Sequence, residues 1–315
     1  MHRLVKYAPM IACVLVGVAT TAAAQERALI GSKSANPILL VARDRDGNPV
    51  EDLKPEDVTV IDNGQPATVL GLERADKIPL RIGILLVGEQ TTFKAQQEAA
   101  IQLLGNLRPG TDQAFVLTQA TTIKPRPWPN QKLIWDPDPK ALTSFVRGLH
   151  WNEAMTSTKD VVMQMLALNP SKPFRRVMLE FRDPGLETGV DYRTMPYAEL
   201  DALLALEISE YQRRNIIVYT STIAGPLGYP INYQPGSVKI ERIAVTTGGR
   251  HLGWNKLQSE VAGMQKDLQN QLLLTFSSEP DNQGQQPHTL EIRVSRKDVR
   301  IAAPRQFYPQ GSTAR

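Results

Sequence analysis

The chain has 315 residues, of which 42% are hydrophobic and 22% charged, and its formal net charge is +4. These values are ordinary for a globular protein, so they exclude a chain that is mostly disordered. The small charge excess and the 6% aromatic content exclude a basic surface with interleaved aromatic side chains, so we expect no nucleic-acid partner.

Residues 1–24 have the pattern of a secretory signal peptide. Basic residues precede a short apolar stretch at residues 10–19, and an A-x-A cleavage sequence lies before Gln25. The apolar stretch is shorter than the roughly 20 residues that a membrane-spanning helix needs, which favours cleavage over an anchor. Lipoprotein processing at Cys13 is another alternative, but too little apolar sequence precedes it. We therefore expect a periplasmic or secreted protein with no membrane span after cleavage.

Cys13 is the only cysteine of the chain, and it lies within the expected signal peptide. The mature protein would then contain no cysteine. Disulfides, thiol catalysis and cysteine metal sites are excluded for such a chain, which must be stabilised by packing alone.

Residues 25–77 are predicted to form an N-terminal β module. Two of its predicted strands, at residues 58–62 and 67–73, are separated by an Asn-Gly turn, and an Asp-Gly turn follows the strand at residues 37–44. Alternating strands joined by such turns give the strongest short-range signal of a β-hairpin.

Residues 78–268 alternate between strand and helix patterns. Apolar strand-like runs are each followed by segments with apolar residues at i, i+4 spacing. Such alternation is typical of a parallel sheet covered by helices. The predicted strands are residues 81–87, 113–120, 175–181 and 215–222. The predicted helices are residues 94–107, 138–149, 158–168, 197–214, 237–248 and 257–269.

Residues 269–315 return to a strand pattern, with candidate strands at residues 270–278, 288–295 and 300–309. The order of the three regions suggests that the two ends of the chain pack together beside the central domain. The predicted fold class is therefore α/β. It combines a doubly wound, mostly parallel sheet with a small flanking β module built from the N- and C-terminal strands.

Several of these segments together resemble one known family. They are "DRDGNPVEDLKPEDVTVIDNGQP", "KIPLRIGILLV", "LRPGTDQAFVL", "RRVMLEFRD", "TTGGR" and "APRQFYP". In this order and spacing they resemble the secreted von Willebrand factor A-related proteins of acidobacteria. The resemblance covers about residues 36–309. It implies a von Willebrand factor A-like central domain that binds a protein ligand.

Domains of this kind usually carry a metal-ion-dependent adhesion site at the carboxyl edge of the sheet. A hard cation such as magnesium needs oxygen ligands in octahedral geometry. The resemblance implies three remaining ligands here. They are Thr92, Thr156 and Asp183.

The first loop departs from the family pattern. The position of the family's first aspartate is Gly88, which has no ligand atom, and the first serine position is Gln90. Because a hard cation is held by charge, loss of a carboxylate predicts a degenerate, metal-free site with no cofactor, although weak magnesium binding stays an alternative. The implied ligand-binding loop consists of Gly88, Glu89, Gln90 and Thr91.

No enzyme motif accompanies these residues. His150, His251 and His288 stand outside any G-x-S-x-G or H-E-x-x-H context, and each is expected to be a loop or packing histidine. The resemblance therefore implies a non-enzymatic binding or adhesion module for an unknown protein or cell-envelope ligand. A structural or assembly protein acting through its β module is the first alternative, and an uncharacterised hydrolase is the weaker one.

Overall fold

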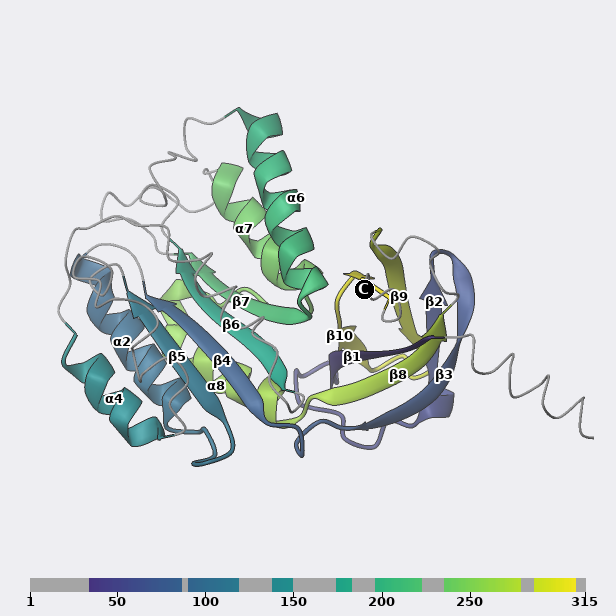
Figure 1. Ribbon diagram of the computed structural model, residues 1–315, viewed down its shortest axis with the longest axis horizontal. Coiled ribbons are helices and arrows are strands. Elements are labelled where there is room, and N and C mark those ends of the chain that lie inside the picture. The colour runs from purple at the N-terminus through teal and green to yellow at the C-terminus, as the bar shows by residue number, and fades with distance from the viewer. Residues whose placement is uncertain are drawn as a thin grey trace, which may run out of the picture.

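The computed structural model describes residues 34–86, 90–118, 138–149, 174–182, 196–222, 235–278 and 286–309. Within these residues the strands form two sheets, one antiparallel with seven strands and one parallel with four (Figure 1). The expected signal peptide at residues 1–24 lies outside the described residues. No helix in the described part of the chain is both long and apolar enough to cross a membrane.

The seven-stranded sheet has the order β10-β1-β8-β3-β2-β9-β11. It curls into a half-barrel, and β10 at one edge comes into contact with β9 near the other edge. The two edge strands are very short, which limits unwanted pairing with other chains. The strands are β1 (Ser34–Arg43), β2 (Val58–Asp62), β3 (Gln65–Arg74), β8 (Leu272–Ser278), β9 (His288–Val294), β10 (Arg300–Ala302) and β11 (Gln306–Phe307).

The predicted fold class is wrong. The largest sheet is antiparallel and the fold is mostly β, whereas a doubly wound, mostly parallel sheet with a small β module was expected. The difference arises because β8 lies between β1 and β3 and pairs along nearly its whole length with both. Local periodicity shows that a segment is a strand, but it does not show which distant segment the strand pairs with.

The Asn-Gly turn between β2 and β3 is confirmed as a hairpin. Asp62 pairs with Gln65, and the two residues between them, Asn63 and Gly64, have φ values of 47° and 79°. Two successive positive φ values match the right-handed twist of the flanking strands, and Asn-Gly is the sequence that adopts them most readily. The turn therefore fixes the register of this hairpin.

A buried histidine-carboxylate pair lies inside the half-barrel. His288 on β9 contacts Asp62 on β2 through Nδ1 and Oδ1 at 2.8 Å, and both residues are at least 91% buried. The His288 ring also packs edge-on against Phe307 at 5.4 Å. The pair links two neighbouring strands in a core that is otherwise mostly apolar.

Replacing His288 with leucine is expected to lower the free energy of unfolding by about 1–3 kcal/mol. Leucine keeps apolar contact with Phe307, but it leaves the Asp62 carboxylate buried without this partner. Urea unfolding followed by circular dichroism measures the change. The matched control is Thr289→Val on the same strand, because Thr289 bonds Asn63 at the exposed surface. Equal effects of the two substitutions would contradict the prediction.

The parallel sheet has the order β5-β4-β6-β7. Every residue of β4 and β7 is buried, as expected for strands covered on both faces. Figure 1 shows α2, α4 and α8 on one face and α6 and α7 on the other. The strands are β4 (Leu80–Leu86), β5 (Gln113–Thr118), β6 (Arg175–Arg182) and β7 (Ile216–Thr222). The helices are α2 (Gln90–Leu104), α4 (Pro139–Arg147), α6 (Tyr197–Arg213), α7 (Pro235–Thr246) and α8 (Leu257–Gln269), with short 3-10 turns η1 (Pro55–Asp57) and η3 (Trp254–Lys256).

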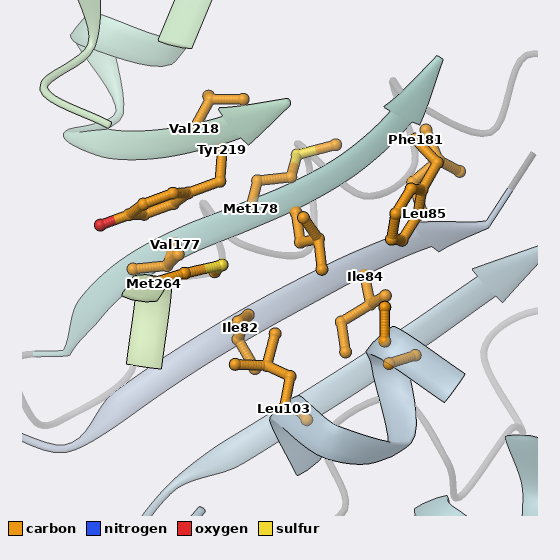
Figure 2. Packing of buried hydrophobic residues seen from close by; sticks show 14 of the residues in the cluster. Ile82, Ile84, Leu85, Leu103, Val177, Met178, Phe181, Val218, Tyr219 and Met264 are labelled. Atoms are coloured by element: carbon orange, nitrogen blue, oxygen red, sulfur yellow. The ribbon is translucent and has the colours of Figure 1, made fainter. Parts of the chain in front are cut away.

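The core between the parallel sheet and α2 and α8 is apolar. Ile82 of β4, Val177 of β6, Leu103 of α2 and Met264 of α8 are fully or almost fully buried and belong to one cluster (Figure 2). Burying such side chains stabilises the fold by about 1.5–3 kcal/mol each. This core holds the strands in place and thereby positions their carboxyl ends.

The two sheets are connected by polar contacts as well as by the chain. Arg43 at the end of β1 forms an ion pair of 2.6 Å with Asp267 of α8, and Arg175 at the start of β6 bonds Gln271 just before β8. The domain boundaries at residues 77/78 and 268/269 stay predictions.

Candidate functional site

The predicted ion site lies mostly outside the described residues. Gly88, Glu89, Thr156 and Asp183 are not described, and for Gln90 and Thr91 only the backbone, in the first turn of α2, is described. Thr92 is the one predicted ligand whose side chain is placed. It is 7% exposed, and its Oγ1 accepts a hydrogen bond from Gln96 Nε2 at 3.4 Å.

The described residues therefore do not bring the predicted metal ligands together. They also contain no group of three histidine, cysteine, aspartate or glutamate side chains that could hold a metal ion. Whether Thr92, Thr156 and Asp183 bind a cation stays a prediction.

The carboxyl end of β6 carries a buried charged network that the sequence reasoning missed. Glu180 and Arg182 are two residues apart on the strand and therefore face the same side, toward α6. Glu207 and Tyr211 are four residues apart on α6 and therefore share the helix face that covers them. Glu180 and Tyr211 have no exposed surface, Arg182 is 1% exposed and Glu207 is 9% exposed.

Arg182 is the centre of this network. Its Nε donates to Glu180 Oε2 at 2.7 Å, and its Nη2 lies 2.6 Å from the same oxygen. Its Nη1 donates to Glu207 Oε2 at 3.3 Å, and its Nη2 also donates to that carboxylate. The guanidinium thus bridges a strand carboxylate and a helix carboxylate with several charge-assisted hydrogen bonds.

Tyr211 completes the network. Its hydroxyl donates to Glu180 Oε1, whereas Arg182 Nε donates to Glu180 Oε2. Burial raises the pKa of Tyr211 well above its ordinary value, and the Glu180 and Glu207 carboxylates raise it further. The phenol is therefore protonated throughout the physiological range and acts as a fixed hydrogen-bond donor.

The arrangement suits positioning better than catalysis. A buried pair of carboxylates needs a compensating cation, and Arg182 supplies it from within the chain. Because the network lies one residue before Asp183, it fixes the end of β6 where the predicted ligand loop begins. The signal in the sequence was weak. It consisted of Glu180 and Arg182, two charged residues at i, i+2 spacing near the end of an apolar strand, in "MLEFR".

The "TTGGR" segment ends α7 and then lines the edge of β7. Gly248, with φ of 89°, and Gly249 bond back to the carbonyls of Val245 and Ala244, which is the Schellman pattern of helix termination. The next residues pair with Thr220 through hydrogen bonds to its N–H and carbonyl, at 3.3 and 2.7 Å. The glycine pair therefore turns the chain from a helix directly onto a strand edge.

His251 lies beside Thr220 at this edge. Its Nδ1 is 3.1 Å from Thr220 Oγ1, and its Nε2 is 3.8 Å from Glu241 Oε1. Burial lowers the pKa of His251, and Glu241 partly opposes that effect. The three groups are arranged as hydroxyl, imidazole and carboxylate, but Thr220 has no exposed surface. A substrate therefore has no access to this hydroxyl, so these three groups do not form a hydrolase site.

Arg250 links the segment that follows α7 to α8. Its guanidinium pairs with Glu260 and, at 3.1 Å, with Asp267, which in turn pairs with Arg43 of β1. A Cβ on Gly263 would lie 2.2 Å from Arg250 Nη2, so the glycine leaves the space that the guanidinium occupies. These contacts brace α8 against both sheets.

Comparisons with known proteins give little further information. No protein-family model matches the chain, and no curated protein matches it. Among solved structures, two of proximal thread matrix protein 1 from the mussel byssus are similar at 12% and 10% identity, with TM-scores of 0.38 and 0.41. The matches cover 61% and 66% of this chain and about half of the mussel protein, 48% and 50%. Similarity at this level carries no argument about fold or function.

Proposed function

We propose that this chain is a non-catalytic binding module of a periplasmic or secreted protein, of the von Willebrand factor A-related kind. Its ligand is a protein or another component of the cell envelope. The binding surface is the carboxyl edge of the parallel sheet, where residues 88–91 follow β4 and residue 183 follows β6. Binding at this edge needs no divalent cation.

The Arg182 network is the observation that carries this proposal. Glu180 and Glu207 are the buried carboxylates described at this edge, and both are neutralised by a guanidinium of the same chain. A metal ion is therefore not needed to balance them. The bonds from β6 to α6 also hold the edge rigid, and a rigid surface loses less conformational entropy on binding.

Affinity capture from an envelope extract, with and without a chelator, tests the proposal. We expect the immobilised protein to retain the same partner in the presence of EDTA and in the presence of magnesium. The double variant Gln90→Ala/Thr91→Ala is expected to capture less of that partner because it changes the proposed binding loop. Loss of the partner in EDTA, with recovery on adding magnesium, would show that the edge binds through a cation and would refute the metal-free site.

An alternative site on the half-barrel is favoured by one observation. Leu70 of β3 is 55% exposed at a β-bulge between Val69 and Gly71. An exposed leucine on a bulged strand is suited to an assembly contact. If Leu70→Asp abolishes capture while Gln90→Ala/Thr91→Ala leaves it unchanged, the chain acts through its β module, and the proposed edge is not the binding surface.

A further inference from the structure

A cavity of about 410 Å³ lies between the two sheets, at the end of the parallel strands opposite to the proposed binding edge. One wall is the outer face of the half-barrel, with Leu39 of β1 and Leu273 of β8. The other wall consists of the first residues of β6 and β7 and the last turn of α6. The volume is within the range of about 300–1,000 Å³ that is usual for small-molecule sites, which often form where two structural units meet.

The charge of this cavity is positive. Arg175 and Arg176 line it, and among the described residues no aspartate or glutamate does. Arg175 bonds the carbonyl oxygens of Ile78 and Leu268 and the side-chain oxygen of Gln271, all of them neutral acceptors. Arg176 donates from Nη1 to the Arg214 carbonyl at 3.4 Å, and its Nε has no hydrogen-bond partner in the part of the chain that the structure describes.

A buried acceptor lies in the same wall. Gln212 of α6 is 3% exposed, and its Nε2 donates to the Thr246 carbonyl at 3.2 Å. Its Oε1 accepts no hydrogen bond from any described residue. A buried polar atom without a partner destabilises the protein that contains it, so two such atoms beside one cavity point to a ligand that supplies the missing acceptor and donor.

Burial affects both arginines in a way that favours an anion. It lowers the pKa of Arg175 to about 10, and it also lowers the pKa of Arg176. The charged form of each guanidinium is thus disfavoured where it lies. An anion bound in the cavity would reverse this effect, since an opposite charge within a few ångströms favours the charged form.

We propose that this cavity binds a small amphipathic carboxylic acid. The carboxylate accepts from the Arg176 guanidinium, whose planar fork matches carboxylate geometry. An O–H or N–H group of the ligand donates to Gln212 Oε1. The apolar body of the ligand packs against Leu39, Leu273 and Ile216, which line the same space. Both unpartnered atoms are covered by neighbouring atoms, so the Arg176 and Gln212 side chains rotate when the ligand enters.

Binding of 8-anilino-1-naphthalenesulfonate tests this proposal, because the probe places one anionic group on an apolar body. We expect saturable 1:1 binding to the folded protein by fluorescence titration and calorimetry. The neutral analogue N-phenyl-1-naphthylamine is expected to bind about tenfold more weakly or worse, because it lacks the charge-assisted hydrogen bonds. Decanoate is expected to displace the probe, and decanol is not.

Four variants locate the binding. Arg176→Gln and the cavity-filling Leu273→Trp are each expected to weaken probe binding about tenfold or more. Arg242→Gln makes the same charge change at an exposed position on α7, and Leu206→Gln removes a leucine of α6 that is 65% exposed; neither is expected to change binding. Circular dichroism and the melting temperature establish that each variant is folded.

Two results would overturn the proposal. The first is the absence of saturable binding to the folded wild-type protein. The second is binding that Arg176→Gln and Leu273→Trp leave intact, or that Leu206→Gln abolishes, since the probe would then occupy the exposed surface. Neither result bears on capture of the partner at the carboxyl edge, so the two sites are tested independently.

Discussion

Replacing Arg182 with methionine is expected to lower the free energy of unfolding by about 3–5 kcal/mol. Methionine fills much of the space of the arginine stem but removes the charge. Glu180 and Glu207 would then face each other's charge in a water-poor site without the guanidinium that bridges them, although the Tyr211 hydroxyl would still donate to Glu180. Urea unfolding at pH 7, followed by far-ultraviolet circular dichroism, measures the loss.

A triple variant separates charge from packing. Adding Glu180→Gln and Glu207→Gln to Arg182→Met removes the unpaired carboxylates and is expected to restore part of the lost stability, since a neutral set avoids the desolvation of buried charge. Arg293→Met is the surface control, because Arg293 pairs with Glu291 on an exposed strand face. If Arg182→Met is no more damaging than Arg293→Met, the network does not stabilise the fold as described.

The effect on binding follows from the same network. Arg182 itself is 1% exposed, so it offers no contact surface to a partner. Its role is to hold the end of β6 against α6. We therefore expect Arg182→Met to capture less partner because the end of β6 is no longer held against α6. The triple variant also lacks the guanidinium but is expected to be more stable. If it captures as little partner as Arg182→Met does, the loss reflects positioning and not unfolding.

The local elements of this fold could be predicted from the sequence where a short-range rule applies. The Asn63-Gly64 hairpin is one example. Another is the start of α4, where Asp138 was expected to open the helix; its side chain accepts from the Lys140 N–H at 2.9 Å, and Pro139 occupies the first turn. Such features depend on residues within one turn of each other, so the information lies in adjacent positions.

The pairing of the strands could not be predicted in the same way. β1 and β8 are more than 200 residues apart in the chain, yet they pair over seven residues from Ser34↔Ser278 to Leu40↔Leu272. The local sequence pattern of β1 or of β8 is equally compatible with a strand in a small module and a strand in a large sheet. The seven-stranded antiparallel sheet therefore replaces the predicted mostly parallel fold for a reason that lies in long-range contacts.

The candidate site shows the same limit. Thr92 was identified through a family resemblance, and its side chain is buried at the start of α2. The Arg182 network was missed because the predicted strand ended at residue 181, one residue short. Its burial also depends on Glu207 and Tyr211 of α6, which lie 25 or more residues away. A charged pair on a strand indicates an exposed face unless a covering helix supplies partners.

Replacing Gly249 with alanine is expected to lower the free energy of unfolding by about 3 kcal/mol or more, although only one methyl group is added. The new Cβ would lie 1.9 Å from the Val218 carbonyl oxygen and 2.8 Å from its carbon. These are backbone atoms of the buried strand β7, so they cannot move aside as the end of a flexible side chain can. The segment that carries Arg250 and His251 would have to separate from the edge of β7, with loss of its two hydrogen bonds to Thr220.

Gly253 provides the matched control for this prediction. It lies four residues further along the same segment, has φ of −66°, and an added Cβ would meet nothing within 4 Å. Gly253→Ala should leave stability unchanged or raise it by up to about 1 kcal/mol, because alanine restricts the unfolded chain. Thermal and urea unfolding of the two variants compare the same chemical change with and without the steric conflict. Equal stability of the two variants would mean that the segment after α7 does not pack against β7 as closely as the Schellman turn and the edge pairing imply.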